Sequence, residues 1–232
     1  MKKVKITLLL LASLLAGPAM AQDLSIRISN LTKGIWFTPL LVAAHGAGTS
    51  LFTEGVAAST SLQAMAEGGD LSGLVSDLQA QGADLMENPA SGLLAPGASV
   101  SLNLMTQAGN DRLSIVAMLL PTNDGFVGLD SLVLPTVAGT YRYHLNAYDA
   151  GTEANTEVVN GGGTPGVPGI PADPGNKAGT GASGVTTVEG NAKVHIHPGN
   201  IGDTNPTGGI SDLDPSAHRW LNPVAELVIT VN

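Results

Sequence analysis

Cysteine is absent from this sequence of 232 residues. Without thiols the chain cannot form disulfides, a cysteine nucleophile or a zinc site built on thiolate ligands. The covalent cross-links of small exported proteins are therefore excluded, and the fold must rest on burial of apolar surface. A mature chain of about 210 residues is long enough to bury one large core, and sandwiches of this size are common.

Basic residues are also few. The sequence has 10 Lys and Arg against 19 Asp and Glu, a net charge of -9. Removal of a leader that contains three lysines and no acids makes the balance 7 - 19 = -12. This excess of acid argues against binding to nucleic acid or adsorption to anionic lipid, because both need compensating positive charge. It suits a cation ligand, and equally a purely solubilising role.

Aromatic side chains are scarce, with two Trp, three Tyr and three Phe in the whole chain. A carbohydrate-binding sandwich needs exposed aromatic platforms, so this class is disfavoured. Trp220 is followed closely by Asn222 and Pro223, and we expect it in the core or at its rim.

The first 21 residues have the pattern of a secretory signal. Lys2, Lys3 and Lys5 form a charged head, residues 6–15 an apolar segment, and residues 19–21 an Ala-x-Ala cleavage site. No later run reaches the roughly 18 apolar residues of a membrane-spanning helix. We therefore expect a protein exported to the periplasm or secreted, without a transmembrane segment.

Local motifs of catalysis are missing. The sequence has no Gly-x-Ser-x-Gly elbow, no His-Glu-x-x-His helix and no glycine loop ending in Lys and Ser or Thr. Scattered catalytic groups would leave no such signature, but the sequence predicts a protein that is not an enzyme.

Eight segments have the pattern of β-strands, and 30 glycines indicate many turns. The opening segment alternates apolar and polar residues, and residues 112–120 are apolar nearly throughout, which is typical of a central strand. The order of strands predicts an antiparallel β-sandwich, as one domain over residues 22–232. The eight segments are 24–31, 35–44, 98–105, 112–120, 129–134, 141–148, 192–197 and 224–231.

Two other segments depart from the strand pattern. Residues 59–82 repeat apolar side chains every three or four positions, which predicts two short helices broken at Gly68-Gly69 and packed on the sandwich. Residues 160–184 are rich in glycine and proline and have few apolar groups. We expect them to form a solvated loop that is mobile.

Three carboxylates form the candidate metal site. Asp149 and Glu153 lie four residues apart in an acidic turn, and Asp124 lies in the loop after the apolar segment 112–120. If these loops meet at one end of the sandwich, a divalent cation would relieve the repulsion between the carboxylates. A hard cation such as Ca²⁺ prefers such oxygen ligands. On spacing alone, an ordinary acidic surface loop remains the alternative.

His195 and His197 form a second candidate pair. Alternate residues of a strand share a face, so both imidazoles could bind one transition metal. A third ligand, for instance Asp203 or His218, would have to approach from elsewhere. The alternative is a pair of surface or hydrogen-bonded histidines.

Three motifs resemble the spondin domain, found in the extracellular matrix protein F-spondin and in short exported bacterial proteins. They are Asp-Gly-Phe-Val-Gly-Leu-Asp-Ser-Leu at 124–132, Tyr-Asp-Ala-Gly-Thr-Glu at 148–153 and Asn-Pro-Val-Ala-Glu-Leu-Val-Ile at 222–229. The resemblance implies a sandwich similar to the calcium-dependent lipid-binding type. It also implies one calcium ion at the end of the sheets, held by Asp124, Asp149 and Glu153.

The sequence departs from the spondin pattern at three points. Glu153 replaces an aspartate of the family turn, Gly125 replaces the tryptophan common in animal proteins, and the cysteines of the animal proteins are absent. The longer glutamate side chain would alter the geometry of the site. The resemblance implies a structural or adhesive, non-catalytic module that acts on an unidentified extracellular or cell-surface partner. A metalloenzyme or transition-metal binder using His195 and His197 is the alternative.

Overall fold

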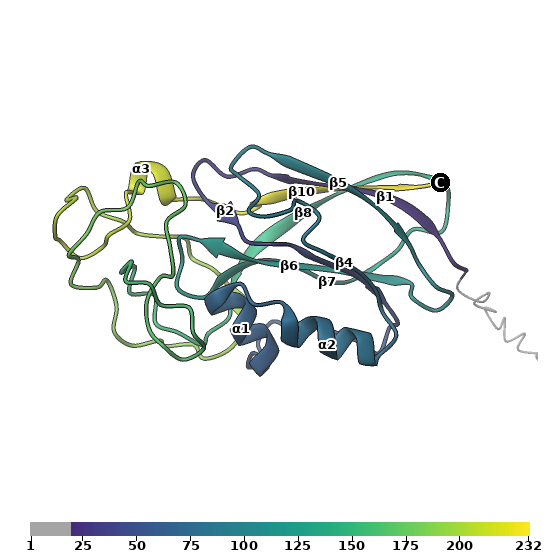
Figure 1. Ribbon diagram of the computed structural model, residues 1–232, viewed down its shortest axis with the longest axis horizontal. Helices are drawn as coiled ribbons and strands as arrows, with labels where there is room; N and C mark the ends of the chain where they lie inside the picture. Colours follow the sequence, from purple (N-terminus) through teal and green to yellow (C-terminus); the bar gives the residue numbers. More distant parts are fainter. Residues whose placement is uncertain (1–19) are drawn as a thin grey trace, which may run out of the picture.

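The computed structural model describes residues 20–232, which form ten β-strands and three short helices (Figure 1). The helices are α1 (Thr60–Gly68), α2 (Ser72–Ala80) and α3 (Pro215–His218). The strands are β1 (Asp23–Asn30), β2 (Trp36–Phe37), β3 (Leu41–His45), β4 (Asp84–Glu87), β5 (Ser99–Met105), β6 (Arg112–Leu120), β7 (Gly125–Val133), β8 (Gly139–Asp149), β9 (His195–Ile196) and β10 (Ala225–Val231).

All these strands pair antiparallel in the order β4-β3-β6-β7-β8-β10-β1-β5, while β2 joins β6 and β9 joins β8. Strand β8 belongs to both halves of the sheet: residues 139–145 pair with β10, and residues 146–149 pair with β7. The two halves lie over each other as layers (Figure 1). The expected all-β antiparallel sandwich is confirmed, in a form that is nearly a barrel.

The two layers enclose the main apolar core. In β1 the alternate residues Leu24, Ile26 and Ile28 are buried, as expected for one face of a strand. Strand β6 is buried along nearly its whole length, because one face meets this core and the other face meets the helices. This double burial explains why residues 112–120 form an unbroken apolar run.

Helices α1 and α2 cover the outer face of the sheet below β6 (Figure 1). Ser59 caps α1 by accepting a hydrogen bond from Leu62 N at 3.1 Å, and Gly69 ends the helix with a φ of 73°. Met65 of α1 and Leu74 of α2 are buried in a second apolar core against the sheet. The predicted pair of broken helices is confirmed.

Some pairings were not foreseen in the sequence. Segments 24–31 and 35–44 follow each other in the sequence but do not pair, because β1 lies between β10 and β5. Segment 35–44 divides into β2 and β3, which both pair with β6. Strand β4 and helix α3 were not predicted either, since each has only four residues and is too short to show a period.

The glycine- and proline-rich segment 160–184 is packed against the molecule, which differs from the solvated excursion expected from its composition. Ile170 is fully buried, Thr180 N donates to Pro206 O at 3.0 Å, and Ser183 N donates to Gly209 O at 3.0 Å. Glycine allows backbones to approach closely, so backbone hydrogen bonds take the place of side-chain burial here.

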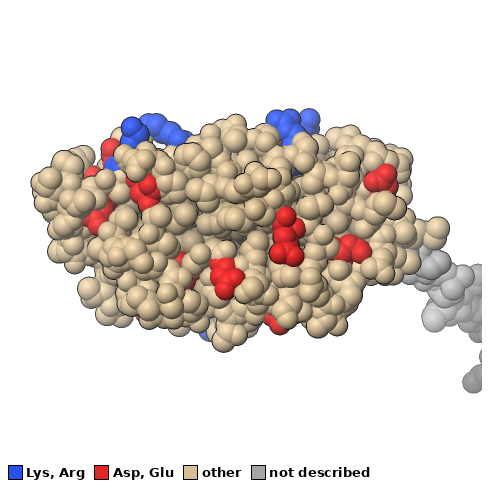
Figure 2. All heavy atoms as spheres, viewed as in Figure 1, with Lys and Arg blue, Asp and Glu red and all other residues tan. Residues whose placement is uncertain are grey.

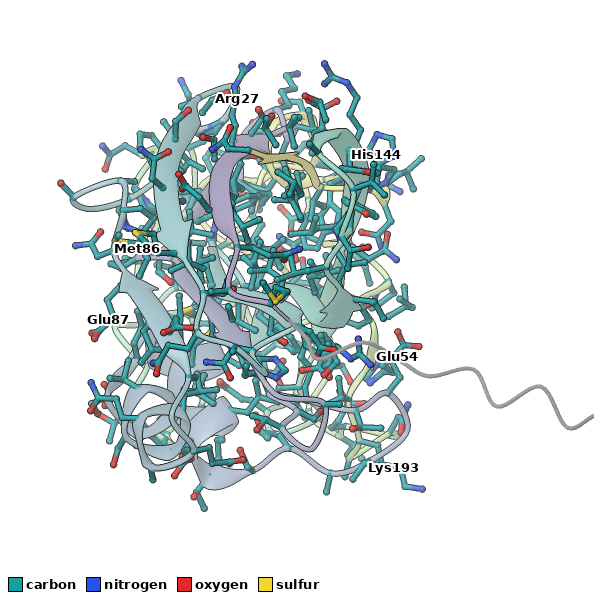
Figure 3. The ribbon with its side chains drawn as sticks, turned by 90° about the vertical axis from the view of Figure 1, so that its right-hand side faces the viewer. Arg27, Glu54, Met86, Glu87, His144 and Lys193 are labelled. Carbon is teal, nitrogen blue, oxygen red and sulfur yellow. The ribbon has the colours of Figure 1, made fainter. Side chains whose placement is uncertain are left out.

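The long loops and α3 gather at one end of the sandwich, and the described chain ends lie at the other (Figure 1). There, Asn232 N donates to Asp23 O at 3.1 Å. In the view of Figure 3, Met86 and Glu87 of β4 lie on the opposite side of the molecule from His144 of β8. Gly139, where β8 begins, pairs with Val231 beside the described chain ends, so the acidic turn that follows the other end of β8 lies at the loop end.

Charge is scattered over the face drawn in Figure 2, where acidic side chains lie apart from one another. In residues 20–232, no helix has the length and apolar character needed to cross a membrane. The predicted signal segment falls almost entirely on residues 1–19, outside the described residues, and stays a prediction.

Candidate cation site

Strand pairing brings the two acidic loops together. Gly125, the first residue of β7, pairs directly with Asp149, the last residue of β8. Asp124 precedes Gly125, and its carbonyl accepts a hydrogen bond from Ala150 N at 3.2 Å. Antiparallel pairing thus places Asp124 beside the turn that begins at Asp149. The predicted meeting of these loops is what the structure shows.

Asp124 organises the acidic turn through one carboxylate oxygen. Its Oδ2 accepts hydrogen bonds from Thr152 N at 2.8 Å, Glu153 N at 3.1 Å and Thr152 Oγ1 at 3.2 Å. Its Oδ1 is buried and has no partner. An unpaired buried carboxylate oxygen is costly, so this atom is a natural ligand for a cation.

Asp149 is fully buried at the start of the turn. Its Oδ1 accepts from Gly151 N at 2.7 Å, and its Oδ2 accepts from Asn155 Nδ2 at 2.6 Å. Gly151 has a φ of +68°, and a Cβ there would lie 2.5 Å from Lys193 N. The glycine of the Asp-Ala-Gly-Thr turn is therefore required by both its conformation and its surroundings.

Glu153 enters the site from the far side of the turn. Its Oε1 accepts hydrogen bonds from Asn123 Nδ2 at 3.2 Å and from Gly169 N. Its Oε2 is buried without a partner, as is Asp124 Oδ1. Two of the three carboxylates therefore use one oxygen to hold the local backbone and keep the other unpaired.

Burial shifts the titration of all three acids. Burial, followed by the charge of Asp149, raises the pKa of Asp124 to about 8. Burial also raises the pKa of Asp149, against the opposing hydrogen bond from Asn155. It raises the pKa of Glu153, where a further contribution comes from the Glu67 carboxylate. The site disfavours three negative charges unless a cation compensates them.

The side chains as they stand do not form a complete coordination sphere. Within residues 20–232, no group of three or more His, Asp and Glu side chains is arranged so as to hold a metal ion. Each of the three carboxylates is instead turned toward hydrogen-bond donors. The two unpaired carboxylate oxygens are of the ligand type that a hard cation prefers.

The ring of His197 lies against Gly125, the position at which the sequence departs from the tryptophan common in animal spondin domains. A Cβ at Gly125 would lie 2.8 Å from Thr122 Oγ1 and 3.0 Å from His197 Cδ2. The ring of His197 lies 4.9 Å from that of Trp220, at 50°. Glycine at 125 thus leaves room for the imidazole, and Trp220 is half-buried in this contact, which agrees with the expected rim position.

The two histidines make different contacts. His195 Nε2 lies 3.8 Å from Asp149 Oδ2, while its Nδ1 is 2.7 Å from Lys193 O. His197 is buried, and its Nδ1 accepts from Gly199 N at 2.9 Å, which leaves Nε2 unpaired. Burial, followed by the charge of His195, lowers the pKa of His197 to about 3.

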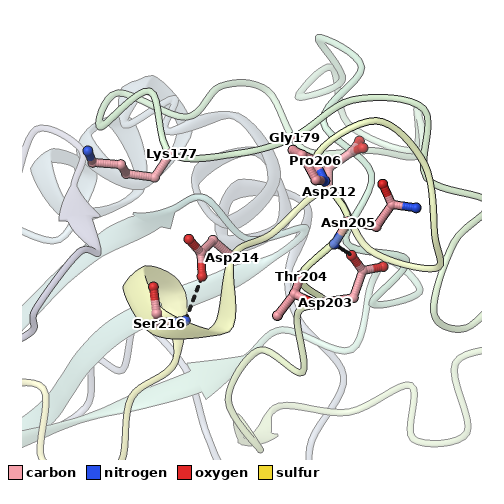
Figure 4. A pocket seen from close by; sticks show the side chains of 9 residues that line it. All are labelled: Lys177, Gly179, Asp203, Thr204, Asn205, Pro206, Asp212, Asp214 and Ser216. Carbon is pink, nitrogen blue, oxygen red and sulfur yellow. Dashed lines mark hydrogen bonds between the residues drawn. The ribbon is translucent and has the colours of Figure 1, made fainter.

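The third ligands considered for these histidines have other partners. His218 Nε2 lies 3.5 Å from Asp173 Oδ1. Asp203 accepts hydrogen bonds from Asn205 N and Ile210 N, at 2.7 and 2.8 Å, in a pocket of about 300 Å³ (Figure 4). Neither contacts His195.

Several residues around the carboxylates were not identified in the sequence. Asn123 and Asn155 donate to Glu153 and Asp149, and Gly169 donates to Glu153 from a segment 16 residues away. The position of Asn123 directly before Asp124 is the one local signal that could have indicated it. Gly169 has none, because glycine is frequent throughout its segment.

The fold and the buried carboxylates define a class: an antiparallel β-sandwich module with an acidic loop cluster at one end. The Spondin_N family model matches residues 30–160, which is more than half of the chain, so the chain belongs to the spondin amino-terminal domain family. No curated protein matches the chain in sequence. Membership supports a non-enzymatic module of the extracellular type.

Proposed function

We propose that this protein is an exported, non-catalytic calcium-binding module with a structural or adhesive role toward an extracellular or cell-surface partner. The observation that carries the proposal is the pair of buried, unpaired oxygens Asp124 Oδ1 and Glu153 Oε2 beside the buried Asp149. Buried polar atoms are nearly always satisfied in folded proteins, so two orphans in one acidic cluster point to a missing positive partner.

The chemistry of the donors favours calcium over softer metals. Asp124, Asp149 and Glu153 supply carboxylate oxygens only, and Ca²⁺ takes six to eight oxygen ligands with tolerant geometry. Zinc and copper prefer nitrogen or sulfur, and the chain has no cysteine. When bound, the ion would supply positive charge that offsets three buried negative charges.

The three acids would then fasten the loop after β6 to the turn after β8. Asp124 already orders the turn through Thr152 N and Glu153 N, and its second oxygen would face the ion. Because the unfolded chain holds no such cluster, binding stabilises the fold by about 2.7 kcal/mol at a calcium concentration of 100 times the dissociation constant.

Thermal unfolding with calcium and with chelator tests the proposal. We expect calcium to raise the midpoint of the wild-type protein and to leave that of Asp149→Asn unchanged. Asp111→Asn is the matched control, since Asp111 is at the opposite end of β6 and its side chain is 41% exposed. If calcium does not change the unfolding midpoint of the wild-type protein, the proposed calcium site is wrong.

A second candidate is a transition metal, favoured by the position of His195 against Asp149 at 3.8 Å. Metal analysis of protein purified without chelator separates the two candidates. One equivalent of zinc or copper that disappears in the His195→Ala, His197→Ala double variant would favour the transition metal. Calcium that is retained in this double variant would favour the carboxylate site.

A further inference from the structure

We infer that residues 160–170, here called the strap, position Glu153 for the cation and couple the site to helix α1 through Glu67. This inference rests on the proposed calcium function. Residues 161–170 lie beyond the 30–160 segment that matches the family model. The strap therefore lies almost entirely outside the segment that the family model matches.

The strap is a closed loop whose two ends touch. Val159 and Ile170 form a parallel bridge, and Ile170 N donates to Val158 O at 2.8 Å. At the same neck, Asn160 N donates to Ile170 O at 3.3 Å. Ile170 is fully buried, so the neck is anchored in the molecule. Compact loops with close ends of this kind hold a defined shape.

Two backbone amides of the strap point at two buried carboxylates from different parts of the chain. Gly169 N donates to Glu153 Oε1, and Gly166 N donates to Glu67 Oε2 at 2.6 Å. Glu67 lies in α1 and is fully buried, with Gln63 Nε2 donating to its other oxygen at 2.8 Å. The strap therefore links the acidic turn to the helix through charge-assisted hydrogen bonds.

Close backbone contact fixes the strap on the end of α1. A Cβ on Gly68, the last residue of α1, would overlap the carbonyl of Gly163. A Cβ on Gly163, whose φ is +107°, would lie 3.2 Å from Glu67 O. A Cβ on Gly162 would overlap Gly169 O. No side chain fits between helix and strap, so the glycines set the distance between the two carboxylates.

The consequence for the site is that Glu153 is held at one oxygen and free at the other. The hydrogen bond from Gly169 N holds Oε1 of Glu153 in place. The buried Oε2 has no partner and remains available to turn toward a cation. A ligand that is oriented before binding loses less entropy on binding. Loss of such orienting contacts lowers metal affinity by roughly 10- to 100-fold.

Gly163→Ala tests the inference, with Gly190→Ala as control because a Cβ at Gly190 meets nothing within 4 Å. Calcium affinity is measured by calorimetry, and amide hydrogen exchange is followed with and without calcium. We expect the dissociation constant of Gly163→Ala to rise by at least about tenfold. In the wild-type and control proteins, calcium should slow amide hydrogen exchange in both the acidic turn and α1. In Gly163→Ala, calcium should slow exchange in the acidic turn but not in α1.

Glu67→Gln provides a second variant with the same shape but no charge. This variant should bind calcium more weakly, and calcium should no longer slow amide exchange in its helix α1. If Gly163→Ala does not fold, Glu67→Gln alone tests whether the strap couples the site to α1. A merely structural strap would lower stability and leave both readouts unchanged, which overturns the inference. Absence of calcium binding to the wild-type protein overturns the proposed function together with the strap, whereas normal binding in both variants overturns the strap alone.

Discussion

The Asp124 carboxylate makes the stability of the calcium-free fold depend on pH between about 4 and about 8. Its pKa is 3.8 in the unfolded chain and about 8 in the fold, because of burial and the charge of Asp149. Below pH 3.8 the acid is neutral in both states. Between these values only the unfolded chain has lost the proton, so the free energy of unfolding falls as pH rises from about 4 to about 8.

Urea unfolding in chelator at a series of pH values measures this dependence. Asp124→Asn is the control, because an amide has no such titration, and its stability should vary less over the same window. If the free energy of unfolding falls equally steeply with pH in the two proteins, the pKa of Asp124 is not raised in the fold.

Addition of calcium to the wild-type protein at pH 7 should release protons, since the cation binds the ionised carboxylates.

His197 has the opposite dependence at acid pH. Burial, followed by the charge of His195, lowers the pKa of His197 from 6.5 to about 3. The resulting stability is fully present above pH 6.5 and is lost as pH falls through about 3, because the unfolded imidazole gains its proton first. In urea unfolding at a series of acid pH values, the free energy of unfolding should fall less steeply in His197→Asn than in the wild-type protein. If it falls equally steeply in both proteins, the imidazole is not buried in its neutral form.

At the level of residues, the sequence could identify Asp124, Asp149 and Glu153 but not their surroundings. The three acids are local features, next to recognisable strands. Glu67 comes from a helix and Gly169 from a segment without periodicity, so their approach depends on tertiary contacts that no spacing records. That Asp124, Asp149 and Glu153 bind calcium stays a prediction.

Among the elements, α1 offers a direct test of a local signal. Ser59 Oγ accepts from Leu62 N at 3.1 Å and satisfies one free amide of the first turn. Ser59→Ala should lower the free energy of unfolding by about 0.5–2 kcal/mol, measured in urea. Ser76→Ala, at an exposed position within α2, should leave stability unchanged or raise it slightly. Equal effects in both variants would refute the capping role.

Elements with a clear period were predicted well, and pairings between distant segments were not. The alternation of β1 and the spacing in α1 are visible because burial repeats along each element. The pairing of β1 with β10 joins the two ends of the sequence, which local patterns do not encode. Strand β4, with the residues Asp-Leu-Met-Glu, is too short to alternate recognisably.

In the whole molecule, the Asp84 side chain connects the end strand β4 to the loop that follows β5, the strand at the other end of the sheet order. Asp84 accepts hydrogen bonds from Gln107 N at 2.6 Å, Gln107 Nε2 at 2.9 Å and Asn110 Nδ2 at 2.9 Å. Asp84→Ala leaves these donors without their acceptor and should lower the free energy of unfolding by about 1–3 kcal/mol in a urea titration. Glu87→Ala, at the exposed other end of β4, is the control and should cost less. A loss in Glu87→Ala as large as that in Asp84→Ala would argue against this connection.

The placement of both described chain ends opposite the acidic turn determines how the sandwich would respond to mechanical force. Asp23 and Asn232 are neighbours, and β1 and β10 run antiparallel from them. A pull that separates these two ends peels the β1–β10 hydrogen bonds one at a time. A pull between the chain ends and a partner held at the acidic turn runs along the strands and loads many hydrogen bonds in shear at once. We therefore expect the sandwich to withstand more force along the line from its described chain ends to its acidic turn than between the two chain ends.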